Sequence, residues 1–304
     1  MFLLFNIFDK LKDLLKEILI GNIQANFESM FGNMNEKIGS IATQVGQTPM
    51  GWNGEVYNFI KNINDNVIIP IAGLIITAVL CIELIQMVMQ RNNMQDADSF
   101  ELYKYVIKAF IAVYLASHAF EFSMAVFDVA QTLVNKAAGV VGVSSEFSSD
   151  QLLAVVESLK DYEIGKLIQI MAETALFKIV LWVVGILINI IVCGRMFEIY
   201  VYSSISSIPF ATMGNKEWGQ IGTNYIKGLF ALGLQGLFLM ICLGIYNVLI
   251  KTVIINSADF IASLGSIVGY AILLCVMMFK SGSISKSVMT VSYTHLTLPT
   301  TPYV

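Results

Sequence analysis

The feature that most constrains this chain is a run of about twenty apolar residues, because a helix of that length crosses a bilayer. The first such run is residues 67–89, VIIPIAGLIITAVLCIELIQMVM, and Glu83 is its one charged residue. At ~1.5 Å per residue it spans a hydrocarbon core of ~30 Å. The chain is 56% hydrophobic and 13% charged, whereas soluble domains carry roughly 25% charge. We therefore predict a multi-pass protein of the cell membrane.

Further apolar segments bring the predicted total to five or six spans, and the predicted class is an all-α, polytopic helical membrane protein. Four of them are residues 105–129, 175–194, 226–250 and 260–279. Residues 196–213 are rich in serine and contain Pro209. They form either a further span buried in the bundle or a continuation of the preceding span that breaks near the proline.

The N-terminal residues 1–24 have a different pattern. Apolar side chains recur there at helical spacing, and charged residues lie among them from Asp9 to Glu17. The pattern predicts an amphipathic helix that does not span. It would lie in the membrane interface or pack against a partner. A helix packed on its own domain fits the same pattern.

The predicted segments divide the rest of the chain. Residues 25–66 are expected to form an extramembrane polar segment, and residues 67–130 the first two transmembrane helices. An extramembrane loop with a helix is expected over 131–170, followed by a bundle of three or four transmembrane helices over 171–286. Residues 291–304, VSYTHLTLPTTPYV, resemble translated vector or adapter sequence. We expect them to be a non-native tail in place of the true C-terminus.

Glycine and proline residues within 25–66 are expected to break any long helix there. They are Gly32, Gly39, Gly46, Pro49, Gly51 and Gly54.

Ionisable residues inside the spans are the candidate functional groups, because a charge at membrane depth is costly unless it faces protein or water. At 100° per residue, His118, Glu121 and Asp128 fall within an arc of ~80° on a straight helix. This polar membrane face suits a proton relay or, more readily, a hydrogen-bonded interface between helices. Glu83 is either a functional group or a structural one that escapes toward the interface from the end of its span.

Catalytic and cofactor motifs are absent from the sequence. There is no Gly-x-Ser-x-Gly, Walker or Gly-x-Gly-x-x-Gly pattern, and the four cysteines are far apart in apolar runs, where small buried hydrophobes are expected. With two histidines, a zinc site would have to draw on carboxylates. A net charge of −4 gives no broad basic surface for nucleic acid. We expect no enzyme activity, no metal and no cofactor.

Three stretches carry a family resemblance: LYKYVIKAFIAVYLASHAFEFSMAVFDVAQ (102–131), GRMFEIYVYSSISSIPFATM (194–213) and IGTNYIKGLFALGLQGLFLMI (221–241). They resemble the TrbL-type polytopic inner-membrane subunit of type IV secretion and conjugation systems, in the branch found on integrative conjugative elements of Gram-positive bacteria. The residues that carry the motif, and are candidates for the channel, are Arg195, Glu198, Pro209, Asn224, Tyr225, Lys227, Gly228 and Gln235.

The resemblance implies a non-catalytic channel subunit of a type IV secretion or conjugative transfer apparatus. Such a subunit helps a single-stranded DNA–relaxase complex, or protein, cross the cytoplasmic membrane. The implied partners are other type IV secretion subunits, including the assembly and coupling ATPases, further copies in a homo-oligomer in the membrane, the translocated DNA–relaxase complex and the lipid bilayer. The alternative is a secondary transporter or another pore-forming protein, although the sequence has one broken segment and no internal repeat.

Overall fold

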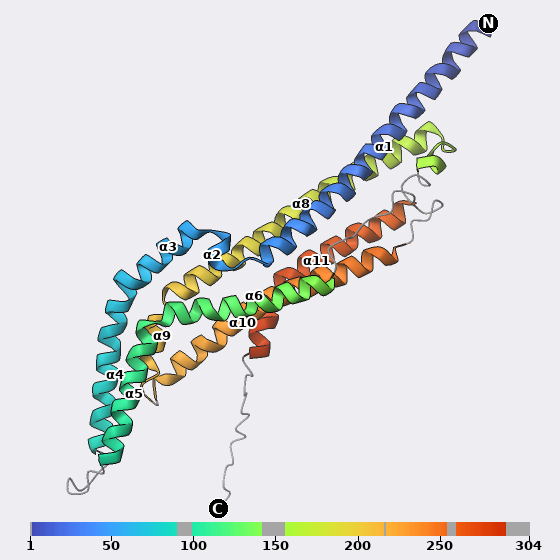
Figure 1. The fold of residues 1–304 in the computed structure, drawn as a ribbon. Coiled ribbons are helices and arrows are strands. Elements are labelled where there is room, and N and C mark those ends of the chain that lie inside the picture. Colours follow the sequence, from blue (N-terminus) through green and yellow to red (C-terminus); the bar gives the residue numbers. More distant parts are fainter. Residues whose placement is uncertain (1, 90–98, 142–155, 216, 254–259, 290–304) are drawn as a thin grey trace, which may run out of the picture. The chain divides into compact units, whose positions relative to one another are not determined.

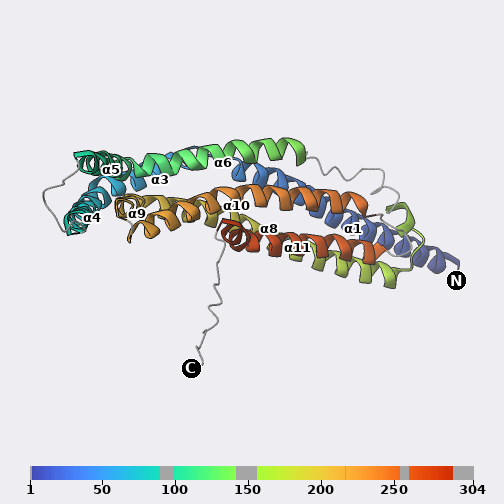
Figure 2. The same ribbon diagram turned by 90° about the horizontal axis from the view of Figure 1, so that it is seen from below.

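The computed structural model describes residues 2–89, 99–141, 156–215, 217–253 and 260–289. These residues form helices and their connections, and no β-strand occurs among them (Figure 1, Figure 2). The predicted all-α class is confirmed. The expected non-native tail, 291–304, lies outside the described residues.

The helices in chain order are α1 Phe2–Val45, α2 Pro49–Trp52, α3 Gly54–Ile63, the π-helix η1 Asn64–Ile68, α4 Ile69–Met89, α5 Ser99–Ser117, α6 Ala119–Val141, α8 Ile164–Ser204, α9 Ser207–Thr212, α10 Gly219–Thr252 and α11 Phe260–Met289.

Four helical segments are long and apolar enough to cross a membrane. They are Gly54–Met89, Ile164–Ser204, Gly219–Thr252 and Ile261–Met289. Helices α5 and α6 together give a fifth candidate, bent by 69° between Ser117 and Ala119. Within the described residues the structure thus supports four or five spans, as expected of a polytopic membrane protein. Residues 196–213 are not a separate span, because α8 runs to Ser204 and the short α9 follows the break.

The chain divides into two compact units, which we describe separately. Unit 1 comprises Met1–Ile60, Phe127–Val201 and Gly236–Ser281, and unit 2 comprises Lys61–Val126, Tyr202–Gln235 and Gly282–Val304. The division cuts across the sequence segments predicted above, whose membrane placement stays a prediction.

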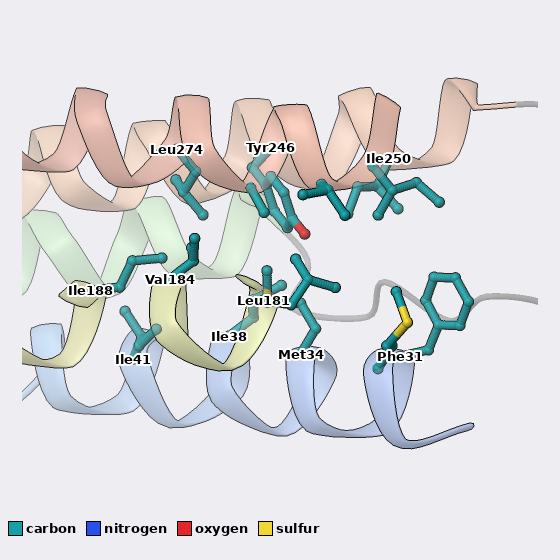
Figure 3. Close-up of a cluster of buried hydrophobic side chains, with 14 of the residues drawn as sticks. Phe31, Met34, Ile38, Ile41, Leu181, Val184, Ile188, Tyr246, Ile250 and Leu274 are labelled. Atoms are coloured by element: carbon teal, nitrogen blue, oxygen red, sulfur yellow. The ribbon is translucent and has the colours of Figure 1, made fainter. Parts of the chain in front are cut away.

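The core of unit 1 is built on one stripe of α1. Its buried members recur every three or four residues, which is the spacing of one helix face. They pack against apolar side chains of α8, α10 and α11 (Figure 3). The stripe consists of Leu19, Ile23, Phe27, Met30, Met34, Ile38, Ile41 and Val45.

The expected helix breaks at Gly32 and Gly39 do not occur, because α1 continues through both to Val45. Glycine inside a helix costs about 1 kcal/mol relative to alanine. Burial of the apolar stripe on both sides of each glycine stabilises the helix by more than this cost. The breaks do come near Gly46 and Pro49, where α1 ends and α2 begins.

The N-terminal part of α1 is helical as predicted. The side chains of Leu11, Leu14, Leu15 and Ile18 are exposed, whereas Leu19 begins the buried stripe. Packing on its own domain is therefore not seen for these four residues, and the interface or partner location of residues 1–24 stays a prediction.

Helices α1 and α8 of unit 1 run parallel to each other. Asn26 of α1 and Thr174 of α8 are 148 residues apart, and the contacts just beyond the pair keep a similar separation: 144 residues for Lys16 and Lys160, which precedes α8, and 151 for Pro49, which follows α1, and Tyr200. The partner number rises on both helices together, so the two point the same way (Figure 1).

Unit 2 is built around α9, which packs against α4 and α5. Its side chains are almost all buried, including Ser207, Pro209 and Thr212. Of the four cysteines, all of which are free thiols, Cys81 of α4 is exposed, so the expectation of burial is wrong for that residue.

Candidate functional site

The candidate site of unit 2 is centred on the break between α8 and α9. Proline has no backbone N–H, and its ring clashes with the carbonyl four residues earlier, here that of Ile205. A continuous helix through Pro209 is therefore disfavoured, and backbone groups near the break lose their helical partners. At membrane depth these groups need a partner from protein or water.

Asn64 supplies that partner. It lies in η1 and is 1% exposed, and its amide donates to the Ser204 carbonyl over 2.9 Å. The same amide donates to Ser207 Oγ over 3.3 Å, and Ser207 Oγ donates back to Asn64 Oδ1 over 3.4 Å. Short π-helical turns inside helices often occur at functional sites. This contact joins such a turn to the break.

Tyr202 and Tyr225 form a second contact across the break. Their rings stack with centroids 4.6 Å apart and planes 2° apart. Each hydroxyl donates to the other residue's carbonyl, over 3.2 Å from Tyr202 and 2.9 Å from Tyr225. The Tyr225 hydroxyl also lies 3.4 Å from Ser123 Oγ of α6. Gly228 lies directly under the Tyr202 hydroxyl, where a Cβ would overlap it.

An ion pair forms the third contact. Lys108 Nζ of α5 lies 2.5 Å from Glu83 Oε1 of α4. Asn215 Nδ2 donates to Glu83 Oε2 over 2.8 Å and to Gln86 Oε1 over 3.3 Å. The Glu83 carboxylate thus has a cation, Lys108, and an amide, Asn215, as partners. The Lys108 ammonium points toward Glu83 and does not only extend toward the membrane–water interface. A cavity of about 420 Å³ adjoins Lys108, and Lys104 also lines it.

The 69° bend between α5 and α6 separates His118 from the helix that holds Glu121 and Asp128. His118 lies at the 69° bend between α5 and α6, with its ring stacked 4.4 Å from that of Tyr114. Glu121 pairs with Lys61 of α3 over 3.0 Å. Asp128 is exposed and belongs to unit 1. The ~80° arc assumed an unbent helix, and the bend changes that geometry for His118, whereas Glu121 and Asp128 are both on α6.

Unit 1 holds Arg195 and Glu198 of the motif. Arg195 is 4% exposed, and its Nε and Nη1 have no hydrogen-bond partner among the described residues. Its guanidinium lies against Gly236, where a Cβ would be 2.6 Å from Nη2 and 2.8 Å from Cζ. Glu198, one turn later on α8, is exposed.

Comparison with known proteins places the chain. The family described as TrbL/VirB6 plasmid conjugal transfer like protein matches residues 34–207, which is 174 of 304 residues. The chain belongs to the TrbL/VirB6 family. No curated protein and no solved structure matches it. It is therefore a membrane component of a conjugal transfer or type IV secretion system.

The TrbL/VirB6 match ends at Ser207, inside the broken segment. It includes Asn64, Glu83 and Lys108 and excludes residues 2–33 of α1 and all of α10. The motif residues beyond it lie in unit 2. Pro209 and Tyr225 are buried at the break, and Gly228 lies at the tyrosine pair. Asn224 is exposed and accepts a hydrogen bond from Gln220, and Lys227 is half-buried. Gln235 is buried, and its Nε2 lies 3.2 Å from the position that a Cβ of Gly282 would occupy.

Several residues of this TrbL/VirB6 site were not singled out from the sequence. Asn64, Asn215 and Tyr202 each form hydrogen bonds that hold the break or the ion pair. Asn64 and Asn215 could have been found as amides next to long apolar runs, where a polar side chain needs a partner. The part of the chain that the structure describes contains no group of three histidine, cysteine, aspartate or glutamate residues placed to hold a metal ion.

Gly228→Ala is expected to destabilise the fold by about 1–3 kcal/mol, because the added methyl group overlaps the Tyr202 hydroxyl and forces the tyrosine pair apart. The thermal midpoint of the purified protein in detergent measures the effect. Gly269→Ala on α11 is the matched control, since its Cβ meets open space. Adding Tyr202→Phe should recover part of the loss. An unchanged midpoint for Gly228→Ala would contradict the packing described.

Proposed function

We propose that this TrbL/VirB6 protein is a non-catalytic channel subunit of its transfer apparatus. It helps a single-stranded DNA–relaxase complex, or a protein, cross the cytoplasmic membrane. The observation that carries this proposal is the interrupted helix of unit 2, with an ion pair and hydrogen-bonded side chains around it. Family membership supplies the apparatus in which such a subunit acts.

The polar groups within the membrane helices of unit 2 support the proposal of a translocation path. Non-helical backbone is tolerated at membrane depth only where protein buries it or water lines it. Ionisable side chains there commonly mark the route of a translocated species. Helices α4, α5 and α9 pack against one another in unit 2, and hydrogen bonds join Asn64 to the break and Asn215 to Glu83 of the ion pair.

The partners follow from the same proposal. Several copies would share one path in a membrane homo-oligomer. The assembly and coupling ATPases supply the energy that a non-catalytic subunit needs, and other secretion subunits continue the route. The Gram-positive integrative element branch remains the expected host context.

A mating assay tests the function. Clean deletion of the gene is expected to abolish conjugative transfer, and expression of the full chain in trans should restore it. A chain ending at Thr290 should restore it equally if residues 291–304 are not native. Immunoblots of the other secretion subunits control for loss of their expression. Transfer that is unchanged on deletion would overturn the proposal and favour the secondary transporter or pore, for which substrate uptake is the assay.

A further inference from the structure

Helix α1 runs beside α8 in unit 1, and its outward face differs in character from that of α8 along the shared length. The offset of 148 residues that joins Asn26 to Thr174 also joins Lys37 to Gly185 (185 − 37 = 148), where Lys37 lies 2.5 Å from the position of a Gly185 Cβ. By this offset, residues 27–45 of α1 and Gly46 directly after it lie level with residues 175–194 of α8. At ~1.5 Å per residue that length is ~30 Å, the thickness of the hydrocarbon core.

The outward face of α8 along this stretch is apolar. Leu176, Ile179, Trp182 and Ile190 are each 59–60% exposed. In water such a face would be a large hydrophobic patch of the kind that soluble proteins rarely expose. Lipid is its natural environment, in keeping with the spanning character of α8.

The outward face of α1 at the same level is polar. No large apolar residue is exposed between Ile18 and Met50, all of which the structure describes. We call this surface the α1 polar face. Its exposed residues are Glu28, Gly32, Asn33, Glu36, Ser40 and Thr43.

A cavity of about 290 Å³ lies between the two helices, and most of its lining is apolar. Its polar lining residues are Ser29, Asn33 and Lys37 of α1 and Lys178 of α8. Lys178 is the one charged residue in 175–194. The charge within the apolar stretch of α8 is therefore directed to the side on which α1 is polar.

Lipid cannot cover the α1 polar face at low cost, because each charge at the centre of a membrane helix costs about 2.5–3.5 kcal/mol. A protein partner is disfavoured as well. Buried interface cores are rich in aromatic residues, methionine and arginine and poor in glutamate and serine. The α1 polar face has the opposite composition.

We propose that the α1 polar face lines a water-filled path at membrane depth. The proposal rests on the channel function proposed above, of which this path would be the part formed by unit 1. It replaces the expectation that all of residues 25–66 lie outside the membrane.

Cysteine accessibility tests the proposal. In a full-length chain with its four native cysteines replaced by serine, Asn33→Cys, Glu36→Cys and Ser40→Cys probe the α1 polar face. Leu176→Cys and Ile190→Cys are matched controls on α8, level with residues 28 and 42, and neither residue lines the cavity. Cells that contain the whole apparatus are treated with a membrane-impermeant maleimide, and labelling is read by gel shift. A thiol reacts as its thiolate, which requires water. We expect the α1 positions to react at least ten-fold faster than the α8 positions.

Each other outcome overturns the proposal. Equal, fast labelling of both helices would mean that this stretch lies outside the membrane. Slow labelling on α1 that becomes fast only after detergent solubilisation would mean that protein or lipid covers the face. Variants are compared only when they elute as the parent chain does in size-exclusion chromatography.

The labelling result is independent of the mating assay, so the two proposals can fail separately. Fast labelling of the α1 polar face, together with transfer that survives deletion of the gene, would overturn the transfer role alone. Slow labelling of the α1 polar face, together with transfer that is lost on deletion, would overturn the water-filled path alone.

Discussion

Lys108→Met is expected to lower the free energy of unfolding by about 3 kcal/mol, one of the two largest effects predicted for this protein. Removing one member of a fully buried ion pair leaves the other charge uncompensated and typically costs 3–5 kcal/mol, whereas an exposed pair contributes about 0–1 kcal/mol. The Glu83 side chain is 17% exposed and that of Lys108 is 40% exposed, so this pair lies between the two cases. The Asn215 amide alone cannot replace the cation.

Thermal unfolding in detergent measures this loss, and Lys104→Met is the matched control. Lys104 is one turn from Lys108 on α5 and lines the same cavity, but its ammonium lies over the Phe100 ring, 4.4 Å from the centroid. A contact of that kind contributes about 0.5–1 kcal/mol. Equal losses from the two substitutions would show that the ion pair adds nothing specific.

The double variant Glu83→Met, Lys108→Met separates structure from function. Replacing both members of an ion pair by apolar residues of similar volume is often neutral or stabilising. We expect the double variant to regain the stability that Lys108→Met loses. The mating frequency of the double variant then decides the role of Glu83. If stability and transfer are both restored, the carboxylate has a structural role. If stability is restored but transfer is not, the carboxylate lies on the translocation path.

Arg195→Leu is expected to raise the stability of the fold by about 1–4 kcal/mol while lowering transfer at least ten-fold. A buried guanidinium whose Nε and Nη1 find no partner in the described part of the chain costs free energy, and an apolar replacement removes that cost. A charge kept against such a cost is retained for function. Thermal midpoints and transconjugant counts on the same variant measure the two effects.

Gly236→Ala is the companion to Arg195→Leu. Its methyl group would lie 2.6 Å from Arg195 Nη2, so the single substitution should destabilise the fold, and combining it with Arg195→Leu should relieve the overlap. Unfolding of Arg195→Leu itself would contradict this account and assign the guanidinium a structural role.

The spans and the broken segment could be predicted because they depend on local sequence. Apolar runs of about twenty residues identify membrane helices wherever they occur. Pro209 among serines predicts an interruption by its own chemistry, and α8 does end at Ser204 just before it. The long α1 could also have been predicted, since the apolar stripe from Leu19 to Val45 keeps its spacing through both glycines.

Pairings between distant segments could not be predicted. The ~80° arc of His118, Glu121 and Asp128 was calculated on a straight helix, and no nearby glycine or proline marks the bend at residue 118. Likewise, the 148-residue offset between α1 and α8 has no local signature, because either helix could satisfy its apolar stripe against another partner. The contact of Asn64 with Ser204 is 140 residues long and has the same origin.

The parallel pairing of α1 with α8 also sets an order of assembly during synthesis. Helix α1 is synthesised before α8, and the partner of Asn26 on α8, Thr174, follows 148 residues later. The core that covers its apolar stripe includes Leu274 and Met278, almost the last described residues of the chain. The N-terminal helix therefore cannot reach its final packing while translation is at α4 to α6. Until α11 has been made, the apolar stripe of α1 lacks part of the core that covers it.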